Sequence, residues 1–138
     1  MTEFAPAQLS ERSFTATNSS IGAARRFVRE ATAEVIDGRE HDLRNDLELA
    51  VSELVTNAVE YGTDAPILVS VRVTPANVVV SVRSTRSASE ISDPSTWAGP
   101  LPAMRTGRGL AIVRAISDDV AVDSDDSTVT VRCTFRTG

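Results

Sequence analysis

Glu53 and Asn57 are the two side chains whose types and spacing best suit chemistry. They stand four positions apart in an amphipathic segment, and a helix places residues i and i+4 on one face, one turn apart. A carboxylate can orient or deprotonate a hydroxyl, and an amide oxygen can ligate a hard cation such as Mg²⁺. The pair therefore indicates a site that combines proton transfer with cation binding. The alternative is an ordinary solvated pair on a helix surface.

A second candidate is the stretch Thr106-Gly107-Arg108-Gly109-Leu110, in which two glycines precede an amphipathic run. Such a pair suits a phosphate that lies over the N-terminus of a helix. All 14 basic residues are Arg, which excludes a Walker-type lysine. Phosphate contacts must then come from Arg or from backbone N–H groups. The alternative is that the glycines only end a loop and that Thr106 only caps a helix.

The bulk composition is that of a single acidic domain. The chain has 138 residues and 41% hydrophobic residues, which is enough for a buried core that would include the single Cys133. The net charge of −5 argues against direct nucleic-acid binding, which usually needs a basic face. No apolar run approaches the roughly 18 residues of a membrane span, and no signal-peptide pattern is present. We therefore expect a cytoplasmic protein without a membrane contact.

The spacing of the apolar residues predicts three helices and five strands around one long loop. The helices are expected at 19–35, 42–61 and 109–116, with Gly38 and Gly62 ending the first two. The strands are expected at 12–17, 66–73, 77–83, 119–123 and 128–136. Residues 1–11 are expected to be loose, and the Ser-, Pro- and Gly-rich stretch 84–108 to form a functional lid. This order predicts an α+β two-layer sandwich over residues 12–138, with helices on one face of a mixed, mostly antiparallel sheet.

The same order, with these motifs at these places, resembles the GHKL ATPase superfamily over residues 12–136. Within it, the chain looks most like the small bacterial anti-sigma-factor serine kinases. Residues 24–30 are similar to a run common in actinobacterial members, 49–58 are close to the family's N box, and 106–113 are close to its second glycine box. The resemblance implies the GHKL ATPase fold and a domain that binds ATP and Mg²⁺, commonly as a homodimer.

By this resemblance, Glu53 is the general base of a serine kinase and Asn57 holds Mg²⁺ on the phosphates. Gly107 and Gly109 let the lid backbone approach the phosphates. The residues expected to bind the nucleotide and its metal are Asn57, Ala58, Ser84, Arg86, Thr106, Gly107, Arg108, Gly109 and Leu110.

The resemblance also implies protein partners. One is a sigma factor that the domain sequesters, and another is an anti-anti-sigma protein of the STAS fold whose serine it phosphorylates. Arg25, Arg26 and Arg29 would suit an acidic surface on such a partner, and the alternative is that they form a solvated helix face. The sequence leaves open which partner the chain has.

One motif departs from the family pattern. The first glycine box, Asp-x-Gly-x-Gly, reads Ser84-Thr85-Arg86-Ser87-Ala88 here. Ser84 replaces the aspartate that receives the adenine amino group, and a neutral hydrogen bond in place of a charge-assisted one would lower affinity about tenfold or more. Arg86 and Ala88 would crowd a close backbone approach, although Arg86 could meet a phosphate or stack on a base. The departure puts both cofactors in question, and kinase activity with them.

Two other interpretations follow from this departure and from the shared superfamily. The first is a pseudokinase module that binds its protein partner without nucleotide. The second is the catalytic domain of a histidine kinase, which we disfavour because the sequence shows no dimerisation helix pair and no phosphoacceptor histidine segment.

Overall fold

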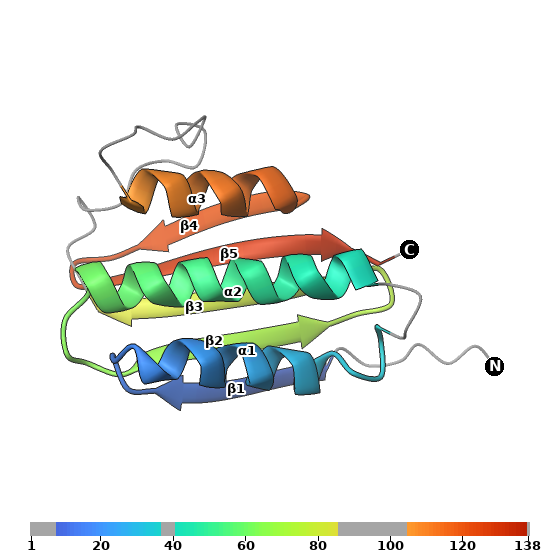
Figure 1. Cartoon of the computed structure of the whole chain (residues 1–138), viewed down its shortest axis with the longest axis horizontal. Helices are drawn as coiled ribbons and strands as arrows, with labels where there is room; N and C mark the ends of the chain where they lie inside the picture. Colours follow the sequence, from blue (N-terminus) through green and yellow to red (C-terminus); the bar gives the residue numbers. More distant parts are fainter. Residues whose placement is uncertain (1–7, 37–40, 86–104, 138) are drawn as a thin grey trace.

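The computed structural model describes residues 8–36, 41–85 and 105–137, which form five strands and three helices (Figure 1). In chain order the elements are β1 (Gln8–Phe14), α1 (Ser19–Ala31), α2 (His41–Tyr61), β2 (Ile67–Val73), β3 (Asn77–Thr85), α3 (Arg105–Ile116), β4 (Asp119–Ser124) and β5 (Thr128–Arg136).

The five strands form one sheet in the order β1-β2-β3-β5-β4, and the three helices lie on the same face of it (Figure 1). Every strand pairing in the described part of the chain is antiparallel. The predicted fold class, an α+β two-layer sandwich of the GHKL type, is confirmed. The parallel pairing that a mixed sheet would contain is not found among these strands.

Alternation along the central strands explains why the helices cover only one face. In β3, Val78, Val80 and Val82 are buried, while the residues between them are half-buried or exposed. In β5, Val129, Val131, Cys133 and Phe135 are buried in the same way. The period of two places these side chains on the helix face. The opposite face carries mainly Ser, Thr and Arg side chains, and no described helix covers it.

Helix α2 lies between α1 and α3 and forms the centre of the helical layer (Figure 1). The apolar spacing that predicts this helix also marks its buried side: Leu47, Ala50, Val51, Leu54 and Ala58 are buried, and Leu43 is half-buried. From α1, Ala24, Phe27 and Val28 join the same core. Cys133 is fully buried, as expected. The central position of α2 makes it the best supported platform for side chains that must be held in place.

Three elements have a boundary that differs by three or more residues from the one the sequence predicts. Strand β1 runs over Gln8–Phe14 and not over residues 12–17, so residues 8–11 belong to the sheet and the expectation of a loose segment there is wrong. Its polar residues gave no apolar alternation, because only Phe14 of this strand is buried. Pairing with β2 fixes the segment instead.

Helix α1 ends at Ala31 and not at Val35. The hydroxyl of Thr32 donates to the carbonyl of Val28 over 2.8 Å, and the Thr32 N–H bonds the same carbonyl. Such a local side-chain bond competes with continuation of the helix. The predicted stop at Gly38 lies outside the described residues.

Helix α3 begins at Arg105, a full turn before the expected start at Gly109. The second glycine box is therefore helical and is not the end of a loop. The rest of the expected lid, residues 86–104, lies outside the described residues. Within residues 8–36, 41–85 and 105–137, no helix combines the length and apolar character that crossing a membrane requires.

Candidate functional site

Glu53 and Asn57 lie in the second half of α2, on the side that faces α3. Asn57 is only 5% exposed, although its side chain is polar, and Glu53 is half-buried. A buried amide is normally retained only where it is hydrogen-bonded or binds something. The burial of these two residues therefore argues against the alternative interpretation, in which they form a solvated pair on the helix surface.

Gly109 of α3 lies directly against Glu53. A Cβ atom built on Gly109 would stand 2.7 Å from Oε1 of Glu53, which is closer than real Cβ contacts. The backbone of α3 therefore packs on the Glu53 carboxylate, and two motifs far apart in the sequence meet at this point. The sequence predicted both motifs but not this contact, because no pattern in either one specifies it.

Burial raises the pKa of the Glu53 carboxyl above its ordinary value, and the nearby negative charge of Glu60 raises it further. The first cause is the removal of water from one side of the carboxylate, since a partly dehydrated anion is less stable than the neutral acid. A carboxyl whose pKa moves toward neutrality is better matched to proton transfer at neutral pH.

Ser84 lies at the end of β3, on the helix face, and is 4% exposed. The chain is tied at this point to the end of α2. The N–H of Thr63 donates to the carbonyl of Thr85 over 2.9 Å, and the N–H of Gly62 closes the helix on the carbonyl of Ala58. A Cβ at residue 62 would stand 2.4 Å from that Ala58 oxygen, so glycine is required for this close approach.

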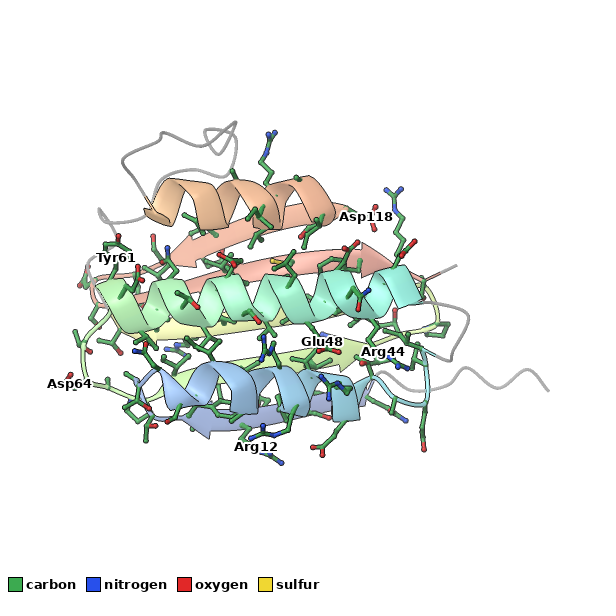
Figure 2. The ribbon with its side chains drawn as sticks, viewed as in Figure 1. Arg12, Arg44, Glu48, Tyr61, Asp64 and Asp118 are labelled. Carbon is green, nitrogen blue, oxygen red and sulfur yellow. The ribbon has the colours of Figure 1, made fainter. Side chains whose placement is uncertain are left out.

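These ties bring three segments to one end of the molecule: the last turns of α2, the end of β3 and the beginning of α3 (Figure 1). Tyr61, at the end of α2, marks this end in Figure 2. The tie between Thr63 and Thr85 was not predicted, because a backbone bond between elements leaves no mark on the sequence. The ending of α2 at Gly62 was predicted and is confirmed.

For residues 105–108 the structure describes the backbone alone, which is helical. The first four N–H groups of a helix have no partner within it, and such groups can bind an anion. Thr106, Gly107 and Arg108 lie in this first turn of α3.

The remaining candidates are placed differently. Ala58 and Leu110 are 2% and 3% exposed, so both side chains belong to the hydrophobic core beneath the site. Arg86 lies outside the described residues.

The donor set fits Mg²⁺ only together with a phosphate ligand. In the described part of the chain, no group of three or more His, Cys, Asp or Glu side chains is arranged to hold a metal ion. Asn57 offers one hard oxygen donor next to the carboxylate of Glu53. Mg²⁺ commonly takes one or two protein oxygens and completes its octahedron with phosphate oxygens and water. The residues therefore suit a Mg²⁺ ion that also binds phosphate oxygens.

Comparison with known proteins agrees with this geometry. A family model described as a histidine kinase-like ATPase domain matches residues 14–135. The structure is similar to the crystal structure of the RsbU and RsbW domains of Rv1364c from Mycobacterium tuberculosis, with a TM-score of 0.69 and 27% identity. That match covers 96% of this chain and 33% of the other, so the chain spans about a third of that protein.

A second solved structure, the Acinetobacter baumannii histidine kinase AdeS, shares the fold with a TM-score of 0.59 and 16% identity. It covers 95% of this chain and 69% of the other. No similar sequence is found among curated proteins. The GHKL-type domain that the sequence predicts is confirmed, and the RsbW match agrees with the anti-sigma-factor kinase type. The chain therefore belongs to the histidine kinase-like ATPase domain family.

Proposed function

We propose that this domain is an RsbW-like regulator that binds ATP with Mg²⁺ and phosphorylates a serine of a STAS-type partner, or sequesters a sigma factor. The observation that carries the proposal is the contact between Glu53 of α2 and Gly109 in the glycine box of α3, with the buried Asn57 one helical turn after Glu53. Bound ATP would supply the transferable phosphoryl group. The chain's own residues would position the reactants and move the proton, as in phosphoryl transfer generally.

Each residue has a defined part in this proposal. Glu53 would accept the proton of the partner's serine hydroxyl, and its raised pKa suits that task. Asn57 would hold Mg²⁺ through its amide oxygen. The N–H groups of the first turn of α3 would bind phosphate oxygens, with Gly107 leaving room for close approach.

A partner surface is available on α1. Arg25 and Arg26 are exposed there, whereas Arg29 is already held by Glu48. An acidic partner would therefore meet Arg25 and Arg26 first. The edge of β1 that does not pair with β2 could join a second copy of the chain, in line with the homodimer that the resemblance implies. The cytoplasmic location remains a prediction from the sequence.

Calorimetric titration with ATP and Mg²⁺ tests the proposal. We expect binding in the micromolar range, abolished in Asn57→Ala and unchanged in Asn45→Ala, which removes an exposed Asn from the same helix. Phosphorylation of STAS proteins should then be lost in Glu53→Ala while ATP binding persists. Absence of binding at millimolar nucleotide would refute the ATP-dependent function.

A second candidate function is a binding module without nucleotide dependence. Ser84 favours it, because this buried position lacks the carboxylate of the family's first glycine box. Partner affinity measured with and without ATP separates the two candidates. Equal affinities would support the binding module, and binding that requires ATP would exclude it.

A further inference from the structure

The carboxylate of Glu53 occupies the space that a side chain at position 109 would need. From a Cβ atom at 109, the distances to Glu53 would be 2.7 Å to Oε1, 3.7 Å to Cδ and 3.9 Å to Cβ. Three atoms of one side chain thus lie around the missing methyl group. The carboxylate could not stay in this place if residue 109 were any other amino acid.

Other glycines of the described chain do not share this relationship. At Gly22, inside α1, the nearest atom to an added Cβ is the flexible end of Arg25 at 4.0 Å. At Gly62, the obstacle is the backbone oxygen of Ala58, which belongs to the end of the helix itself. Among these three, Gly109 alone faces a chemically active side chain from another element.

Glycine has a low helix propensity, so its presence inside α3 is informative. Glycine inside a helix destabilises it by roughly 1 kcal/mol relative to alanine. Gly109 is the fifth residue of α3, inside the helix and not at its end. A contact that needs the missing side chain can offset this cost, and the Glu53 carboxylate lies directly against this position.

We propose that Gly109 is a positioning residue, whose missing side chain forms the slot that holds the Glu53 carboxylate against the backbone of α3. The chemistry of Glu53 rests on the proposed function, but the slot itself does not. It follows that α3 and the candidate base move together. Any displacement of α3 would change both the orientation of Glu53 and its exposure to water.

The charged groups near Glu53 determine what a change in its titration can report about the slot. On its own helix, Glu60 is the charged neighbour. From α3, the residue that lies against the carboxylate is Gly109, which carries no charge. Alanine at 109 adds no charge either, so a change in the titration of Glu53 in that variant would report displacement and hydration.

The test uses nucleotide-free protein and four variants: Gly109→Ala, Glu53→Ala, their combination, and Gly22→Ala as the matched helical glycine. Thermal unfolding gives the stability of each. Carbon-detected NMR of the Glu53 carboxyl gives its titration midpoint. We expect Gly109→Ala to lower the midpoint, because the Glu53 carboxylate must turn away from the added methyl group, and to raise the melting temperature less than Gly22→Ala does. Gly22→Ala should leave the midpoint unchanged and raise the melting temperature by about 2–5 °C, as alanine does in open helix positions.

The double variant, with Gly109→Ala and Glu53→Ala combined, distinguishes two explanations. One is the slot for Glu53, and the other is that α3 does not tolerate alanine at position 109 for any reason. With Glu53 already truncated, Gly109→Ala should stabilise the helix as fully as Gly22→Ala does. The proposal is overturned if Gly109→Ala leaves the Glu53 midpoint unchanged, or if its effect on the melting temperature is the same with and without Glu53. Since no nucleotide is used, failure of ATP binding would not affect this outcome, and the two proposals fail separately.

Discussion

Arg29 on α1 donates two parallel hydrogen bonds to Glu48 on α2, from Nε to Oε2 over 3.1 Å and from Nη2 to Oε1 over 2.7 Å. Figure 2 labels Glu48 on α2, the helix that also carries Glu53 and Asn57. This fork geometry is the strong form of a charge-assisted hydrogen bond. It fixes α1, which carries the exposed Arg25 and Arg26, to the helix of the candidate site.

The pair between Arg29 and Glu48 predicts a pH-dependent stability. The hydrogen bond from Arg29 lowers the pKa of the Glu48 carboxyl below its ordinary value. Its stabilisation is therefore present above the unfolded pKa of about 4.3 and is lost as pH falls through the lower folded value. In thermal unfolding, Glu48→Gln should be less stable than the native chain at pH 7, with the two curves converging in acid. The exposed Glu34→Gln is the control, and a gap that does not close in acid would contradict this account.

Leu110 is expected to stabilise the fold and not to contact nucleotide. It is 3% exposed, so Leu110→Ala should lower the free energy of unfolding by about 2–5 kcal/mol. Leu49 on α2 is 40% exposed, and Leu49→Ala should change it by about 0.5 kcal/mol or less. Urea denaturation of both variants measures the difference. Equal effects would show that burial does not govern these positions.

Ser84→Asp restores the carboxylate of the first glycine box and should have two opposite effects. The apo domain should lose about 1–3 kcal/mol of stability, because a charge is introduced at a position that is 4% exposed. ATP affinity should rise about tenfold if Ser84 faces the base. Ser81→Asp, on the other face of the same strand, is the matched control for calorimetry. An unchanged affinity in Ser84→Asp would remove position 84 from the site.

Cys133 should be chemically silent in the native protein. Burial raises the pKa of its thiol to about 12, and the hydrogen bond with Ser117 offsets this only in part. The thiolate is the reactive form, so labelling with a chromogenic disulfide at pH 8 should require unfolding. The same reaction in denaturant supplies the control. Rapid labelling of folded protein would mean that this part of the core opens readily.

Much of the fold follows from local patterns that tertiary structure did not override. Alternating Val residues predicted the β2–β3 hairpin, and the apolar stripe of α2 predicted which side of that helix is buried. The placement of Glu53 and Asn57 on one flank followed from their spacing alone. These predictions were correct because the period of the apolar residues matches the pattern of buried residues along each element.

The errors at β1 and α3 occurred where elements meet, whereas the end of α1 is set locally by the bond from Thr32 to Val28. Polar β1 is a strand from Gln8 because β2 offers it a partner, and no propensity of its own indicates this. Helix α3 begins at Arg105 although two glycines lie in its early turns, which propensity opposes, and Gly109 packs on Glu53 of α2. The bond between Arg29 and Glu48 depends on how α1 and α2 are aligned. The spacing of residues within either helix does not predict this alignment.

The face of the sheet that no described helix covers has a thermodynamic consequence. Strands such as β3 and β5 bury every second residue beneath the helices, while the rows between them remain in contact with water in the native state. Unfolding then exposes less new apolar area than it would from a sheet covered on both faces. The heat capacity change and the denaturant m-value should both be low for a chain of this length. The stability curve of the domain should accordingly be broad, with a weak dependence on temperature around its maximum.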